Sequence, residues 1–134
     1  MNANTRSGDS PTWTLPPHFS RERRQLEAAG IASWPSLAAM DDATLRQLGR
    51  SGGASEARMV RLRGQARLIV EVGLEPADAA LLLHAGVPDR RALAEADPQR
   101  LLVQMGRLQR RLTGMAAPLI SLGTLQGWIR RARG

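Results

Sequence analysis

A twenty-residue pattern occurs twice in this chain at a constant spacing of 56 residues, with no gap. Residues 26–45 read LEAAGIASWPSLAAMDDATL and residues 82–101 read LLHAGVPDRRALAEADPQRL. Seven of the twenty positions are identical: Leu26/Leu82, Ala29/Ala85, Gly30/Gly86, Leu37/Leu93, Ala38/Ala94, Asp41/Asp97 and Leu45/Leu101. Such matched spacing predicts two copies of one supersecondary unit.

Each copy is expected to form a helix, a tight glycine turn, a short helix and a further helix that an aspartate caps. Gly30 and Gly86 stand where a helix ends and a positive φ is tolerated. Asp97 directly precedes Pro98, the clearest helix start in the chain, because a capping carboxylate is followed by a residue without an N–H. We expect a flexible tail over residues 1–19, a first unit over residues 20–73 and a second unit over residues 74–134.

Composition favours an all-α fold and argues against an enzyme. The chain has 134 residues, with three Trp, one Phe and no Tyr, so Leu, Ala, Ile, Val and Met must fill its core. It has no Cys and two His, His18 and His84, which excludes a thiolate metal site and leaves too few ligands for an ordinary His site. We expect no catalytic residues, metal or cofactor. No apolar run approaches the ~20 residues of a membrane span, so a cytoplasmic protein without a membrane partner is expected.

The net charge of +7 comes entirely from one end of the chain. Residues 1–97 hold 12 arginines and 12 acids, whereas residues 98–134 hold 7 arginines and no acid. All 19 basic residues are arginine, a side chain whose planar fork suits phosphate. Codon bias in a GC-rich genome is the alternative explanation for this choice.

The repeated residues resemble those of the tandem helix-hairpin-helix proteins, and in particular an uncharacterised bacterial family known as a domain of unknown function. The resemblance covers about residues 20–133. Its residues are Leu26, Ala29, Gly30 and Ile31 with Leu37 and Ala38, their second copies Leu82, Ala85, Gly86 and Val87 with Leu93 and Ala94, and the closing Trp128, Ile129 and Ala132. It implies two helix-hairpin-helix units packed about a pseudo-two-fold axis.

The resemblance also implies phosphate binding by backbone amides at the glycine turns, here Gly30, Ile31 and Ala32 in the first unit and Gly86 in the second. Such binding is independent of base sequence and sensitive to salt. This chain lacks the second glycine of the usual turn, since Ala32 and Pro88 stand there, and Pro88 has no N–H to donate. Both glycines can instead be simple helix C-caps.

Arginine spacing gives a second route to the same partner. On a helix over residues 98–113, Arg100, Arg107 and Arg111 lie within about 40° of one another, and Arg130 and Arg131 follow in the last helix. We therefore expect a non-catalytic module that binds nucleic-acid backbones without sequence specificity. Two alternatives stay open: the arginines can form an ordinary solvated face, or the protein can be an interaction adaptor with degenerate hairpins that binds an acidic protein.

Overall fold

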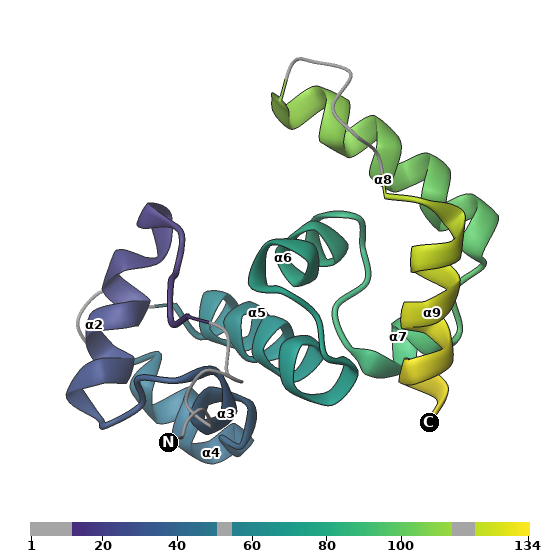
Figure 1. The fold of residues 1–134 in the computed structure, drawn as a ribbon. Coiled ribbons are helices and arrows are strands. Elements are labelled where there is room, and N and C mark those ends of the chain that lie inside the picture. Colours follow the sequence, from purple (N-terminus) through teal and green to yellow (C-terminus); the bar gives the residue numbers. More distant parts are fainter. Residues whose placement is uncertain (1–11, 51–54, 114–119) are drawn as a thin grey trace, which may run out of the picture.

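The computed structural model describes residues 12–50, 55–113 and 120–134, and every regular element in these ranges is helical (Figure 1). The first unit contains a short 3₁₀ turn, η1, four helices and a π-helical turn, η2, that continues the last of them; the second unit contains four helices. Their bounds are η1 Pro17–Phe19, α2 Ser20–Ala28, α3 Trp34–Ala38, α4 Asp42–Leu48, α5 Glu56–Arg67 and η2 Leu68–Val72, followed by α6 Pro76–His84, α7 Arg90–Ala94, α8 Pro98–Thr113 and α9 Leu122–Arg133. The all-α prediction is confirmed.

The two glycine turns have the same geometry, hydrogen bond for hydrogen bond. Gly30 and Gly86 hold φ angles of 84° and 89°, just after α2 and α6. The Gly30 amide donates to the carbonyl of Glu27 at 3.0 Å, and the Ile31 amide donates to that of Leu26 at 2.8 Å. The equivalent bonds in the second unit, Gly86 to Leu83 and Val87 to Leu82, measure 3.1 and 2.9 Å. This pair of bonds defines a Schellman helix end, so the turns are two copies of one structure.

The caps after each turn repeat as well. Ser33 accepts the Ser36 amide at the start of α3, and Asp89 accepts the Ala92 amide at the start of α7. Asp41, rather than Asp42, caps α4 through the amide of Thr44. Its equivalent Asp97 accepts the amide of Gln99 at the start of α8. The aspartate cap that the sequence pattern predicted is therefore present in both units, and a side-chain cap on the short helix accompanies it.

The repeat extends further than the sequence pattern, to α5 and α9. Each is a twelve-residue helix whose N-cap serine, Ser55 or Ser121, accepts an amide of the first turn. The buried residues also correspond, as Met59 with Leu125, Leu62 with Trp128 and Ala66 with Ala132. The spacing here is 66 rather than 56, because α8 has 16 residues where α4 has 7. Each unit is thus a group of four helices, and the pseudo-two-fold packing of the units stays a prediction.

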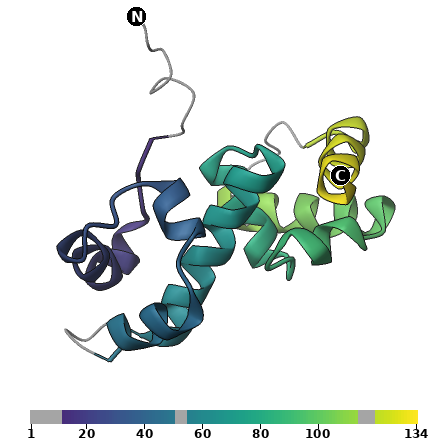
Figure 2. The same ribbon diagram turned by 90° about the horizontal axis from the view of Figure 1, so that it is seen from below.

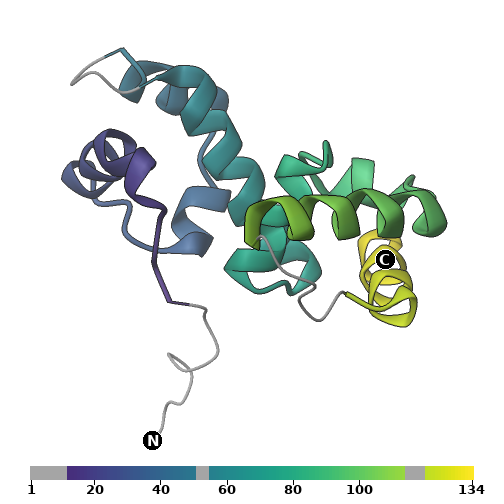
Figure 3. The ribbon, with the colours of Figure 1, turned by 90° about the horizontal axis from the view of Figure 1, so that it is seen from above.

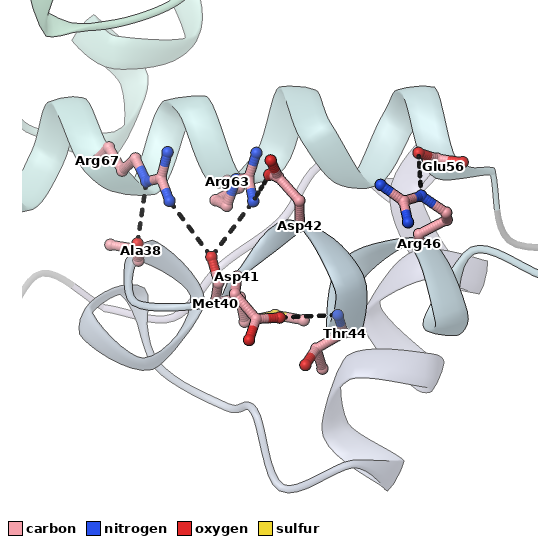
Figure 4. A network of polar contacts seen from close by, with 9 residues as sticks. All are labelled: Ala38, Met40, Asp41, Asp42, Thr44, Arg46, Glu56, Arg63 and Arg67. Atoms are coloured by element: carbon pink, nitrogen blue, oxygen red, sulfur yellow. Dashed lines mark hydrogen bonds and ion pairs between the residues drawn. The ribbon is translucent and has the colours of Figure 1, made fainter.

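In each unit, an arginine at the end of the last helix binds the free carbonyls that end the short helix. Arg67 on α5 donates to the carbonyls of Ala38 and Met40 at 3.0 and 3.3 Å (Figure 4). Arg63 donates to the same Met40 carbonyl at 3.2 Å and pairs with Asp42 at 2.7 Å. In the second unit Arg133, the equivalent of Arg67, donates to the Ala94 carbonyl at 2.8 Å. A cation at a helix C-terminus satisfies orphan acceptors and opposes the negative end of the dipole.

Residues 12–19, which were expected to belong to a flexible tail, pack on the first unit; residues 1–11 lie outside the described part. Trp34 is fully buried and donates its indole N–H to the Thr12 carbonyl at 2.9 Å, while the Trp13 ring meets the Trp34 ring edge-on with centroids 5.0 Å apart. Glu27 accepts from Arg23 and from Trp13, and these two bonds lower the pKa of its carboxyl group.

The two units lie side by side, with α5 running toward the second one (Figures 2 and 3). Helix α6 packs along α5, and the second glycine turn meets α5 closely at Gly64. A Cβ atom at Gly64 would lie 2.5 Å from the Pro88 carbonyl oxygen, nearer than real contacts allow. Val87 in the same turn is 7% exposed. The absence of a side chain at Gly64 therefore lets the second unit dock.

Candidate nucleic-acid interface

The glycine turns do not offer the set of free amides that was expected of them. The amides of Gly30, Ile31 and Gly86 all donate to carbonyls of the preceding helix, as described above. Ala32 is exposed, and its amide has no partner within the described residues. The structure thus agrees with the helix C-cap interpretation of both glycines, and it leaves arginine side chains as the main cationic groups available to a partner.

Helix α8 presents four arginines to solvent: Arg100, Arg107, Arg110 and Arg111, which we call the α8 arginine face. All four are exposed, and none has an ion pair or a hydrogen bond in the described part of the chain. The opposite side of the helix is buried through Leu101 and Met105, which are 2% and 0% exposed. The predicted ridge of Arg100, Arg107 and Arg111 is therefore a solvent-facing stripe.

Three of these arginines lie on a segment that the first unit lacks. The residues of α4 correspond to Pro98–Gln104 of α8, so residues 105–113 are an extension. The end of α8 projects beyond α9, which packs against its beginning (Figures 1 and 3). Residues 107–112 are all exposed or partly exposed, so the guanidinium groups of the extension are open to solvent.

The arginines of α9 divide into one free group and two that bind the fold. Arg130 is exposed without a partner and borders a shallow pocket beside Pro98 at the start of α8. Arg131 donates to the Val72 carbonyl at 2.7 Å, which ties α9 to the end of the first unit. Arg133 binds the Ala94 carbonyl, as above. Of the predicted site residues on α9, Arg130 therefore lies beside the start of α8 with its charge free, whereas Arg131 already binds the Val72 carbonyl.

The described residues show no arrangement typical of a catalytic or metal centre. They contain no group of three or more His, Cys, Asp or Glu side chains that could hold a metal ion. Burial raises the pKa of Asp78 in the first turn of α6, and the nearby Glu75 carboxylate raises it further. In this part of the chain, however, no His, Ser or Thr side chain is hydrogen-bonded to Asp78. None of the described helices is both long and apolar enough to cross a bilayer.

Within the described residues, these observations define an all-helical protein built from two tandem four-helix units. In the second unit, helix α8 carries four exposed arginines that have no hydrogen-bond or ion-pair partner. Residues 16–134 match the family model described as Domain of unknown function (DUF4332), and the chain belongs to this family. No curated protein matches the chain. No solved structure matches it either.

Proposed function

We propose that this protein is a non-catalytic module that binds nucleic-acid backbones without reading base sequence, through the α8 arginine face. The observation that carries the proposal is the set of four exposed arginines on α8 that have no internal partner in the described structure. Phosphate contacts from arginine supply affinity without sequence information, because they neutralise charge and release counterions.

Two further features support this proposal. Residues 98–134 contain no Asp or Glu, so no neighbouring carboxylate in that segment competes for the guanidinium groups. The free Arg130, beside the start of α8, adds a further unpaired cation to the second unit. In the first unit Arg23, Arg46, Arg58 and Arg63 pair with carboxylates. The exposed arginines there that have no partner among the described residues are spread over α2, the turn after α4 and helix α5: Arg21, Arg24, Arg50 and Arg61. The proposed mode uses side chains, with the Ala32 amide as the remaining backbone donor of the first glycine turn.

The test is the binding of a mixed-sequence DNA duplex at about 50 and 200 mM salt. The double variant Arg107→Gln/Arg111→Gln should weaken binding at least about tenfold at the lower salt and reduce the slope of log K against log salt by about two. The control Arg24→Gln/Arg50→Gln removes the same charge from exposed, unpaired arginines of the first unit. Binding that ignores salt, or equal losses in both double variants, would contradict the proposal.

A protein-interaction adaptor is the second candidate, and the exposed apolar residues of α8 favour it. Val103 and Leu112 are 53% and 61% exposed, and Val103 lies between arginines on the α8 arginine face. A mixed basic and apolar face suits an acidic protein partner better than a bare duplex. The distinguishing experiment is a pull-down with and without nuclease. A stoichiometric acidic protein that survives nuclease and is lost in Val103→Gln would support the adaptor and count against nucleic-acid binding.

A further inference from the structure

A pocket away from the α8 arginine face collects both histidines of the chain. It has a volume of about 250 Å³ and lies between the residues preceding α2, the helix α5 and the helix α6. His18 comes from the first of these segments, Arg58 and Arg61 from the second, and His84 from the third. In Figure 1, α5 runs between α2 and α6, which brings these distant parts of the sequence to one place.

One part of the pocket wall carries basic side chains, and the other part is apolar. Four of its residues carry guanidinium or imidazole groups, and no lining residue carries a carboxylate. The apolar part includes Phe19 and Leu83. Arg61 is exposed and has no partner in the described structure, so its charge is available to a ligand. Ligand pockets typically combine an apolar wall with a few polar groups that fix orientation.

Arg58 is held in place before any ligand arrives. Its Nε lies 3.4 Å from Oε1 of Glu22, its guanidinium stacks over the Phe19 ring at 4.8 Å, and another of its nitrogens donates to the His18 carbonyl. Glu22 is 2% exposed, and its second oxygen accepts the Ser55 amide at 3.0 Å. Because Glu22 is satisfied and lies below the lining, it fixes Arg58 rather than competing for the pocket. Such preorganisation lowers the entropic cost of binding.

We infer that this pocket binds a small phosphate monoester that carries an apolar or planar group. The phosphate matches the free charge of Arg61 and the remaining N–H groups of Arg58, whose own charge the Glu22 carboxylate partly balances, and it accepts hydrogen bonds from both imidazoles. The apolar group lies against Phe19 and Leu83. The volume accommodates a small organic molecule. This site is separate from the proposed nucleic-acid face.

Phenyl phosphate is a suitable probe, because it combines both parts of the ligand. Titration should shift the NMR signals of the two imidazole rings in a saturable way, and phenyl phosphate should bind at least about tenfold more tightly than inorganic phosphate or phenol. The variant Arg61→Gln should weaken this binding about tenfold. Because Arg61 is exposed and unpaired, its replacement leaves the fold intact, which the unchanged thermal unfolding of the variant verifies.

The matched control is Arg107→Gln, which removes one charge from the α8 arginine face. It should leave phenyl phosphate binding unchanged while weakening duplex binding, so the two proposals fail separately. The absence of a saturable shift, an equal loss in Arg61→Gln and Arg107→Gln, or binding of inorganic phosphate as tight as that of phenyl phosphate would each overturn the inference.

Discussion

Gly30 and Gly86 hold backbone angles in the left-handed region, which costs other residues conformational energy. The space around both is open, since a Cβ atom at either position would meet nothing within 4 Å. Any effect of replacing them therefore comes from the backbone and not from a clash. Substitutions at these two glycines therefore measure the conformational energy of the backbone alone, without a contribution from steric clash.

Gly30→Ala and Gly86→Ala should each lower the free energy of unfolding by about 1–2 kcal/mol, because alanine at positive φ brings its Cβ close to the carbonyl oxygen. Urea unfolding measures the change. Gly123→Ala is the control: this glycine lies in the first turn of α9 with ordinary φ, and its replacement should leave stability unchanged or slightly higher. Equal effects at all three positions would contradict the explanation.

Asp41 should make stability depend on pH in the acid range. The backbone amide and then the side chain of Thr44 bond to its carboxylate and lower its pKa below the usual 3.8. For a carboxyl with a depressed folded-state pKa, the stabilisation is complete above the unfolded value and is lost as pH falls through the folded value.

The variant Asp41→Asn keeps the cap and removes the titration. We expect the wild type to be the more stable of the two near about pH 7, with the difference shrinking by about pH 2, as thermal unfolding at both values would show. A difference that stays constant over this range would rule out the carboxylate as its source.

At the scale of elements, the bonds that hold the short helices come from far along the chain. Arg67 reaches Ala38 and Met40, and Arg133 reaches Ala94, so the same contact was kept in both units. Arg67→Met should cost about 2 kcal/mol, since it removes two charge-assisted bonds and leaves the Ala38 carbonyl without its donor, while Arg63 still donates to the Met40 carbonyl. The exposed Arg61 on the same helix serves as the control, and Arg61→Met should change stability little. Chemical denaturation measures both.

Sequence reasoning succeeded where a few adjacent residues determine the structure. The glycine helix ends and the Asp41 and Asp97 caps follow from local chemistry that any copy of the pattern shares. The equivalence of α5 and α9 was missed, because the longer α8 shifts the spacing and the matching residues differ in type, as Leu62 and Trp128 do. Their common signal is a capping serine followed by matched apolar positions and a final arginine.

The candidate sites were less predictable, because they depend on contacts between distant residues. Nothing local separates the free Arg130 from Arg131, whose partner is the Val72 carbonyl 59 positions away. The placement of His18 and His84 around one pocket likewise depends on how α6 packs against α5. The exposure of the α8 arginines was predictable, since their spacing gathers Arg100, Arg107 and Arg111 on a side of the helix away from Leu101 and Met105.

For the whole molecule, the decisive contact is the docking of the second unit on Gly64. Gly64→Ala should lower the free energy of unfolding by about 1–3 kcal/mol, although alanine normally stabilises a helix, because its Cβ forces the Pro88 carbonyl to move. Gly127→Ala in α9 is the control and should raise stability by up to about 1 kcal/mol, since only the flexible end of Arg130 lies near it. A stabilised Gly64→Ala protein would show that the units are not tightly joined there.

The absence of a side chain at Gly64 also distinguishes α5, against which the second unit packs, from the equivalent helix α9. In α9 the position equivalent to Gly64 carries Arg130, an exposed and charged side chain. A third copy could not approach α9 as the second approaches α5, because a guanidinium group stands where the incoming turn would rest. One arginine in place of one glycine thus gives α9 a charged surface at the position where α5 offers bare backbone to its neighbour.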